Sequence, residues 1–415
     1  MTKSKIYYVL TLPFFFPNIS FNIFSFDVSP LPLLAALFIL ITTSKKYPSI
    51  LYYLWVPSIF SIPFIFTTFG DWPYFFRLIG VYFTAPMVAM ACYRAIFVGV
   101  AIGKLARDAI YISFIGALTQ KFISINFFSY LLQSRSTESR GYNSLFAEPS
   151  FFGMATLMFC IIYIASNKII GTKNSWLPLA VGFISITLLS QSALVILILL
   201  VTISLYLLVD LRPKSLALLI FIIILITITS LFIEEGNDSR LMRVTYSILK
   251  SPQDILLIDA SISERVMHVY LSVKGAAMNY FMPNGFYRFY DSILIEMNEN
   301  QYFWWGEPSN KIMSGIGSAL YEIGFVALIT PWILVLLTVR NNFKRGFLIF
   351  SIATPIFIYS NAINFASPYF SILIGLLAYG SKKHKYQLLL AQHHSIYAPG
   401  IITAVVDKRH AVRFN

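Results

Sequence analysis

The chain has 415 residues, of which 57% are hydrophobic and only 12% are charged. A soluble domain of this length needs a larger polar surface to cover its core, so the composition excludes an ordinary soluble globular protein. The formal net charge of +13 would point to nucleic acid in a soluble protein. In a membrane protein, lysine and arginine concentrated in cytoplasmic loops explain such a charge, and we expect no nucleic-acid partner.

The apolar residues fall into runs long enough to cross about 30 Å of hydrocarbon as helices. Inside a bilayer the backbone polar groups must be satisfied internally, which leaves helices or a closed barrel. The continuous run at 215–233 lacks the alternation of a barrel strand. We therefore predict an all-α polytopic membrane protein with about twelve transmembrane helices. In chain order they cover residues 6–24, 30–43, 48–69, 74–93, 109–130, 150–166, 176–190, 192–209, 215–233, 314–339, 346–359 and 364–379.

Lysine and arginine set the orientation of these spans. With the N-terminus inside, the basic residues of the short loops fall on the cytoplasmic side, and an even number of spans places both termini there. The predicted parts are an N-terminal bundle, a first outward loop, central spans six to nine, a large outward loop, spans ten to twelve and a cytoplasmic tail. Their boundaries are 1–130, 131–149, 150–233, 234–313, 314–380 and 381–415.

The two outward loops hold most of the remaining basic residues. The first carries Arg135 and Arg140, and the second carries seven further basic residues and more than half of the 18 acidic ones. The second segment is too long for a simple connector. The excess of lysine and arginine on the cytoplasmic side holds for short loops and does not constrain the charge of long ones. We therefore expect the functional residues in these two segments.

The tripeptide Glu148-Pro149-Ser150 marks the start of the sixth predicted span. Two interpretations are open. In the structural one, Pro149 suits the first helical turn, Glu148 complements the helix dipole, and Ser150 helps to cap the helix. In the functional one, a carboxylate held at the membrane face eight residues after Arg140 is a catalytic base or a sugar ligand.

From Arg140 to Gly153 the sequence reads Arg-Gly-Tyr-Asn-Ser-Leu-Phe-Ala-Glu-Pro-Ser-Phe-Phe-Gly. This segment resembles one in the Wzy-type O-antigen and exopolysaccharide repeat-unit polymerases of the O-antigen polymerase and ligase superfamily. Further short similarities are a Leu-Ser-Gln-Ser turn at 189–192, Ser-Glu-Arg at 263–265, Pro-Asn-Gly-Phe at 283–286 and Ser-Ala-Leu-Tyr-Glu-Ile-Gly at 318–324. One spacing departs from the family. In some members a glycine follows an arginine after ten intervening residues, whereas Phe151 and Ala276 stand at those positions after Arg140 and Arg265.

The resemblance implies a glycosyltransferase that polymerises oligosaccharide repeat units carried on undecaprenyl diphosphate. The reaction would take place at the outer face of the bacterial inner membrane, with O-antigen, exopolysaccharide or capsule as the product. The resemblance implies no metal, no nucleotide sugar and no other cofactor. It implies lipid-linked glycans and the bilayer as partners, and it points to a chain-length regulator and a flippase as further ones.

A diphosphate leaving group needs cations, and the planar fork of arginine suits phosphate oxygens. An acceptor hydroxyl needs a general base near the same place. Together with the resemblance, these requirements select Glu148 as the first catalytic candidate and His268 as the second. The candidates for binding diphosphate or glycan are Arg140, Arg265, Arg288, Arg77 and Tyr142. The competing interpretations are solvation or lipid-headgroup contact for the arginines and a structural role for the histidine.

Two other functions fit parts of the pattern. An O-antigen ligase, which transfers finished glycan to a lipid core, would share the architecture and the carrier chemistry. The Phe-x-Glu-Pro-Ser segment favours the polymerase over the ligase. A polysaccharide transporter or flippase would show charges or broken helices near the bilayer midplane and a two-fold repeat, and the sequence shows neither.

Overall fold

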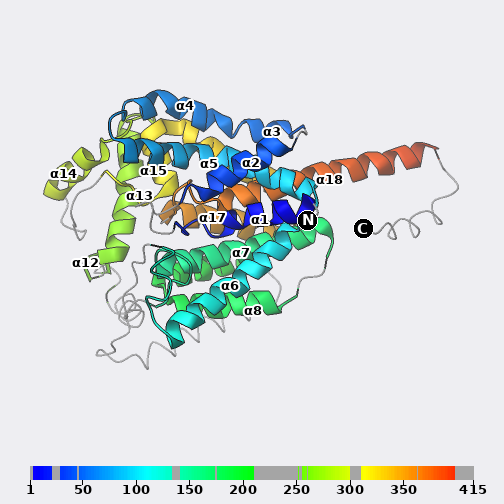
Figure 1. The fold of residues 1–415 in the computed structure, drawn as a ribbon. Helices are drawn as coiled ribbons and strands as arrows, with labels where there is room; N and C mark the ends of the chain where they lie inside the picture. The colour runs from blue at the N-terminus through cyan, green and yellow to red at the C-terminus, as the bar shows by residue number, and fades with distance from the viewer. Residues whose placement is uncertain are drawn as a thin grey trace.

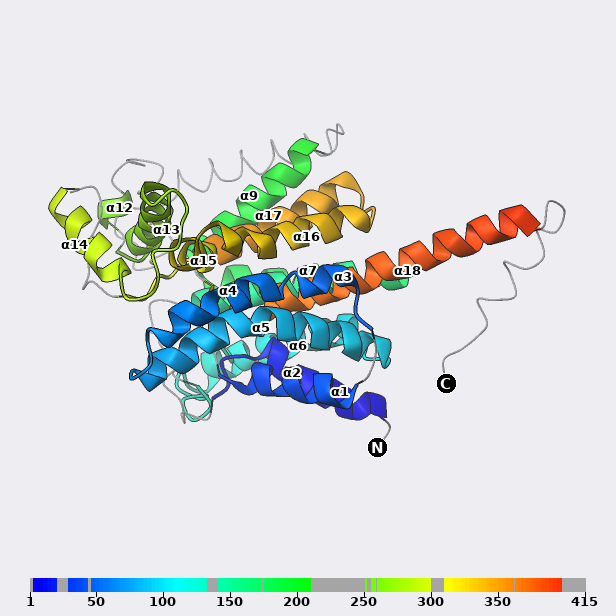
Figure 2. The same cartoon turned by 90° about the horizontal axis from the view of Figure 1, so that it is seen from above.

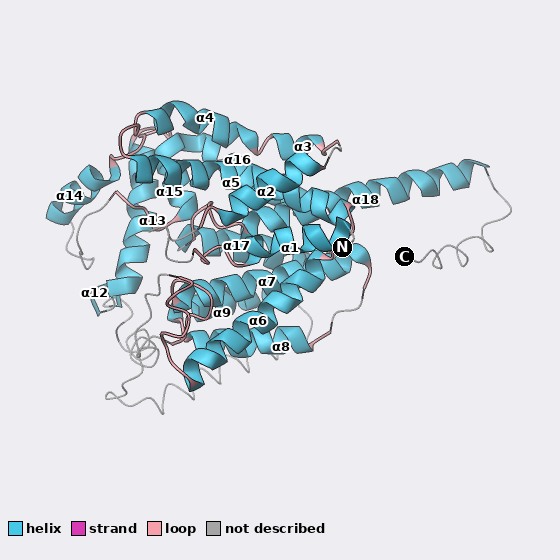
Figure 3. Cartoon of the chain, viewed as in Figure 1, coloured by secondary structure: helices cyan, strands magenta, loops and turns pink. Residues whose placement is uncertain are grey.

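The computed structural model describes residues 3–20, 29–43, 46–132, 141–172, 175–209, 251, 255–258, 260–299, 310–361 and 363–397. All regular elements in these ranges are helices (Figure 3). The predicted all-α class is therefore confirmed for the described part of the chain. The predicted span 215–233 and the candidate Arg140 lie outside the described residues.

The described residues up to 209 form nine labelled α-helices. They are α1 (Lys3–Phe15), α2 (Leu31–Thr42), α3 (Ser49–Tyr52), α4 (Trp55–Phe66), α5 (Trp72–Phe97), α6 (Ile102–Phe122), α7 (Pro149–Ile170), α8 (Leu177–Ile184) and α9 (Ala193–Val209). A π-helical turn, η2 (Ser185–Ser190), continues α8.

The described residues from 255 to 397 form helices of the predicted large outward loop and the last helices of the bundle. The helices are α12 (Ile255–Ile258), α13 (Ala260–Met278), α14 (Phe289–Glu299), α15 (Gly315–Ile323), α16 (Ile329–Arg340), α17 (Arg345–Asn361) and α18 (Tyr369–Tyr397). A 3₁₀ turn, η4 (Gly324–Leu328), joins α15 to α16.

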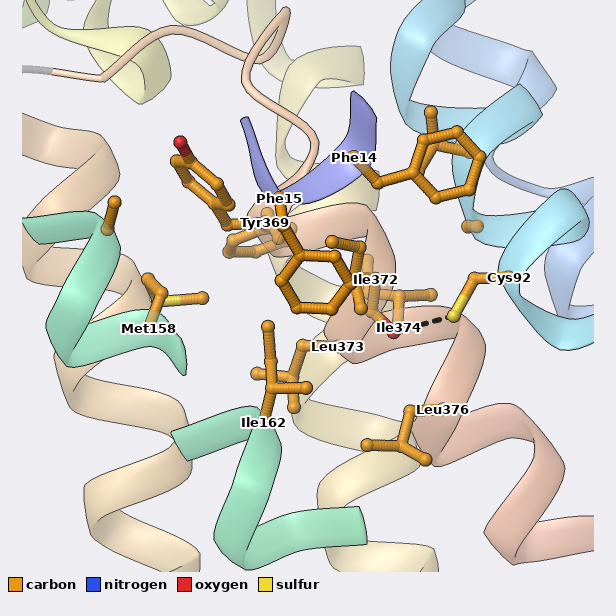
Figure 4. Packing of buried hydrophobic residues seen from close by; sticks show 14 of the residues in the cluster. Phe14, Phe15, Cys92, Met158, Ile162, Tyr369, Ile372, Leu373, Ile374 and Leu376 are labelled. Atoms are coloured by element: carbon orange, nitrogen blue, oxygen red, sulfur yellow. Dashed lines mark hydrogen bonds between the residues drawn. The ribbon is translucent and has the colours of Figure 1, made fainter. Parts of the chain in front are cut away.

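The core lies where α1, α5, α7 and α18 meet. α18 packs along both α5 and α7, and α6 packs along α7. Phe14 and Phe15 of α1 are fully buried, and Figure 4 shows the Phe15 ring beside Ile162 of α7 and Leu373 of α18. α7 is buried around almost its whole circumference, so its first turn is held firmly where the chain enters it.

Within the described ranges, four helical stretches are long and apolar enough to cross a membrane. They are Ser49–Phe66, Trp72–Phe97, Pro149–Ile170 and Gly315–Arg340. Shorter apolar helices cover Leu31–Thr42, Leu177–Ser190 and Ala193–Val209. By length and composition these helices are compatible with a helical membrane protein, which is what the sequence predicts. The number of twelve spans and the sidedness of the loops stay predictions.

Three predicted helices have wrong boundaries. The helix expected at 6–24 begins at Lys3 and ends at Phe15. The helix expected at 109–130 begins at Ile102 and ends at Phe122. Its polar first turns are accommodated because Asp108 accepts hydrogen bonds from Arg107 at 2.8 Å and from the Tyr8 hydroxyl at 2.9 Å. The helix expected to end at residue 379 continues as α18 to Tyr397, so the predicted tail 381–415 begins as helix.

The helices of the predicted large loop gather at one end of the bundle. In Figures 1 and 2, α12, α13 and α14 lie together at the left, whereas the N-terminus and the free end of α18 lie at the right. α13 packs on α15 and α17. The segment 260–299 is therefore a helical part of the fold rather than an extended connector.

Candidate functional site

The site begins at the first turn of α7. Glu148 is the N-cap residue in extended conformation, and Pro149 occupies the first helical position, as the sequence predicts. The side chain of the N-cap residue Glu148 makes no capping hydrogen bond. The Ser150 hydroxyl instead donates to Glu148 Oε2 at 3.2 Å. Both side chains are thus directed toward a group outside the helix.

That group is Arg265 in the second turn of α13. Its Nη2 atom lies 3.5 Å from Glu148 Oε2 and donates to Ser150 Oγ at 3.1 Å. The side chains of Arg265 and Glu148 are 12% and 24% exposed, so the pair is largely but not completely shielded from water. We call Glu148, Ser150 and Arg265 the Glu148–Arg265 cluster. It joins the two segments in which the sequence predicts the functional residues.

A buried polar network holds the backbone that leads into Glu148. The side-chain amide of Gln120, on α6, donates to Asn143 Oδ1 at 2.6 Å and accepts from the backbone N–H of Ser144 at 2.7 Å. Asn143 Nδ2 donates to the Phe146 carbonyl, and the Ser144 hydroxyl donates to the Ser113 carbonyl. Residues 143–147 are buried, so this part of the predicted outward loop is packed into the protein.

Gly141 and Tyr142 attach the same segment to η2. The Tyr142 backbone N–H donates to the Leu189 carbonyl at 2.9 Å. Gly141 has a φ of +86°, and a Cβ there would lie 2.5 Å from the Ser190 carbonyl oxygen. The serine-rich turn singled out in the sequence therefore supports the approach to Glu148. The Tyr142 ring packs, partly buried, against the main apolar core.

Two further charged residues, Glu264 and Lys311, lie near the cluster. Glu264 precedes Arg265 on α13, and Lys311 lies in the segment before α15. Burial raises the pKa of the Glu264 carboxyl, and Glu148 acts in the same direction, whereas Arg265 and Lys311 oppose the shift. The site thus combines carboxylates and cations in a partly desolvated place, where electrostatic interactions are stronger than in water.

His268 lies one turn after Arg265 but faces the interior. It is 3% exposed, and its ring centroid lies 5.3 Å from that of Phe289. Its Nδ1 accepts from the backbone N–H of Met313 at 3.3 Å. Burial, assisted by Lys311, lowers the pKa of His268 to about 4. At neutral pH the ring is therefore uncharged with its proton on Nε2, and it anchors the chain that leads into α15.

Arg77 and Arg288 lie toward the other end of α13. The Arg77 guanidinium lies 5.8 Å from the centre of the Tyr74 ring. Arg288 is exposed, and its carbonyl accepts from the Tyr321 hydroxyl at 3.0 Å. Tyr321 packs on Gly275, which is ten residues and about 15 Å along α13 from Arg265. No described hydrogen bond or ion pair joins either arginine to the Glu148–Arg265 cluster.

A second polar group lies near Arg77. Glu322 of α15 is 7% exposed and accepts a hydrogen bond from the Tyr82 hydroxyl. Tyr287 donates to Asp71 at 2.9 Å and lies with its ring 4.4 Å from that of Tyr74. Aromatic and acidic groups of α5, α15 and the segment before α14 thus meet at this point, apart from the Glu148–Arg265 cluster.

No protein-family model, curated protein or solved structure matches the chain. Among the residues that the structure describes, no group of three or more histidine, cysteine or carboxylate side chains is placed to hold a metal ion.

Some supporting residues carry no motif in the sequence. Gln120 and Lys311 are ordinary polar residues outside the quoted motifs, and the only signal for Gln120 is that the fifth predicted span is more polar than the others. What the arrangement offers chemically is a guanidinium, a carboxylate and a hydroxyl within hydrogen-bonding reach of one another. The first suits a phosphate and the second suits a hydroxyl proton.

Proposed function

We propose that this protein is a glycosyltransferase that polymerises oligosaccharide repeat units carried on undecaprenyl diphosphate. The proposal places the reaction at the outer face of the bacterial inner membrane, with both termini of the chain in the cytoplasm. The observation that carries it is the Glu148–Arg265 cluster, in which a carboxylate at the start of α7 meets an arginine of α13. The similarity to the Wzy-type segment around Glu148 supports the same function.

In the proposed reaction Arg265 binds the diphosphate of the donor lipid. Phosphate oxygens compete for the guanidinium that now contacts Glu148 and Ser150, and their binding frees the Glu148 carboxylate. The carboxylate then accepts the proton of the acceptor hydroxyl while the oxygen of that hydroxyl attacks the anomeric carbon of the donor. The bond from that carbon to the diphosphate breaks, and the leaving diphosphate takes the electron pair. Arg265 stabilises the charge that develops on it.

The other candidates have supporting roles in this proposal. Arg77 and the aromatic residues Tyr74 and Tyr287 lie toward the other end of α13 from the cluster and offer faces and hydrogen bonds for a glycan. His268 acts by holding the segment before α15, and with it Lys311, against α13.

The surface-polysaccharide pattern of a deletion strain tests this function. Loss of a polymerase leaves single repeat units on the lipid core, whereas loss of a ligase leaves long chains on the polyprenyl carrier. We expect single repeats in the deletion strain and a restored ladder when the wild-type gene is returned. Long chains retained on the carrier would contradict the proposal and identify a ligase.

Complementation with variants tests the site. Glu148→Gln and Arg265→Ala should leave single repeats although the protein reaches normal levels in the membrane. Lys274→Ala is the matched control, because Lys274 is a basic residue of the same helix that pairs with Glu296 at 2.7 Å, away from the cluster. It should restore the full ladder.

A further inference from the structure

A buried arginine near the end of α5 has hydrogen-bond donors without partners. Arg94 is 2% exposed, and its Nε and Nη1 atoms are buried and form no hydrogen bond. Its guanidinium carbon lies 4.0 Å from the centre of the Tyr47 ring. No described carboxylate forms an ion pair with it. A buried charge without hydrogen-bond partners is costly, so these donors call for an anionic ligand.

The groups around Arg94 fit an anion. The hydroxyl of Tyr93 is also buried and without a partner, and its ring lies 6.2 Å from the Tyr47 ring. The ammonium of Lys382, on α18, lies 6.0 Å from the centre of the Tyr93 ring. A guanidinium, a phenol and the ammonium of Lys382 thus lie around the Tyr47 and Tyr93 rings, with no acidic partner described among them.

This group lies at the opposite end of the bundle from the Glu148–Arg265 cluster. Lys383, next to Lys382 on α18, donates to the carbonyl of Ile169 in the last turn of α7. Glu148 immediately precedes the first turn of that helix. α7 has 22 residues and is therefore about 33 Å long, close to the thickness of a bilayer core. Figures 1 and 2 show α18 leaving the bundle at this end.

We propose that Arg94, with Tyr93 and Lys382, forms a binding site for the phosphate group of an anionic phospholipid. The fork of a guanidinium matches phosphate oxygens, and its two free donors supply directional contacts. Arg94 lies in the last turn of Trp72–Phe97, which is long and apolar enough to span a membrane. The end of such a span lies at the level of the lipid headgroups.

The surface beside the site suits acyl chains better than water. The centroids of the Tyr52 and Tyr47 rings lie 6.0 Å apart. Tyr52 is 53% exposed and Phe97 is 41% exposed. A free inorganic phosphate would gain nothing from these apolar faces, whereas a phospholipid would cover them. The half-buried Tyr47 ring covers the guanidinium, so it must shift when the phosphate replaces it as the partner of the charge.

Lipid titration of the purified full-length protein in neutral detergent tests the site. The unfolding temperature is followed while phosphatidylglycerol, phosphatidylcholine or inorganic phosphate is added, and the concentration dependence gives an apparent affinity. We expect phosphatidylglycerol to stabilise the wild-type protein more strongly than phosphatidylcholine, and inorganic phosphate to have little effect. Arg94→Gln should weaken the affinity for phosphatidylglycerol about tenfold or more, because charged hydrogen bonds are lost.

Three further variants keep the test decisive. Arg94→Lys keeps the charge but loses the planar fork of the guanidinium, and Lys382→Gln removes the charge that lies near the Tyr93 ring. Both variants should weaken binding, and Lys382→Gln should do so about threefold. Arg107→Gln is the control, because Arg107 already donates two hydrogen bonds to Asp108, and its affinity should stay unchanged. An equal loss of affinity for phosphatidylglycerol in Arg107→Gln and Arg94→Lys would show that the lipid is held by general charge attraction, and it would overturn the proposal. Equal stabilisation by inorganic phosphate would overturn the assignment to a lipid.

Discussion

Replacing Arg265 and Glu148 with alanine, singly and together, measures how strongly the two predicted segments are coupled. Nη2 of Arg265 lies 3.5 Å from Glu148 Oε2. Two unit charges at this distance attract by about 5 kcal/mol at an effective dielectric constant of about 20. Both side chains are largely shielded from water, and the desolvation free energy of the two charges offsets much of that attraction. We therefore expect a coupling energy of about 2 kcal/mol, within the range found for contacting residues.

The coupling is measured by equilibrium unfolding in mixed detergent micelles. Each single variant should lose stability, because it leaves a partly buried charge without its partner. The double variant should lose about 2 kcal/mol less than the sum of the two single losses. Losses that add within about 0.5 kcal/mol would show that the segments act independently, and they would refute the reasoning that places Glu148 and Arg265 in one site.

Three other variants test the surroundings of the site. Burial keeps the pKa of His268 at about 4, below its unfolded value of about 6.5, so unfolding takes up a proton and stability falls as pH drops from 6.5 toward 4. Between pH 7.5 and 5 the wild-type protein should lose about 2 kcal/mol more than His268→Gln, read from thermal unfolding in detergent. Gln120→Ala should destabilise the protein by roughly 2 kcal/mol and abolish polymer formation, because Asn143 and the backbone that leads to Glu148 lose buried partners. Stable protein with a normal ladder would contradict that role. Gly324→Ala should lower stability by roughly 2 kcal/mol, since Gly324 has a φ of +69° and a Cβ would lie 2.5 Å from the Phe281 carbonyl oxygen; an unchanged unfolding temperature would speak against this contact.

The positions of the helices follow from apolar runs and from residues that end helices. The run predicted at 150–166 is α7, and its observed ends are marked by Pro149 and by Gly171, which has a φ of +86°. The charged start of α6 was missed because a sequence shows Arg107 and Asp108 as two charges, whereas the fold joins them to each other and to Tyr8. Such pairing depends on helices that are distant in the chain.

In the candidate site, too, some residues could be predicted from the sequence and others could not. Glu148 and Arg265 are conspicuous charges in segments that the topology sets apart, so the sequence could single out both, and the structure brings them together. It does not bring Arg77 or Arg288 to them, because α13 separates the two groups along its axis. The Gln120 network could not be predicted, because neutral hydrogen bonds between a helix and a loop leave no spacing pattern in the sequence.

Polymerisation of lipid-linked repeat units by the purified protein tests the central claim most directly. The wild-type protein and Lys274→Ala should produce a ladder of chain lengths from undecaprenyl-diphosphate-linked repeats, with a metal chelator present and no nucleotide sugar added. Glu148→Gln and Arg265→Ala should leave the repeats unjoined while unfolding no more than a few degrees below the wild type. A normal ladder from either cluster variant, or none from the wild-type protein under these conditions, would contradict the account.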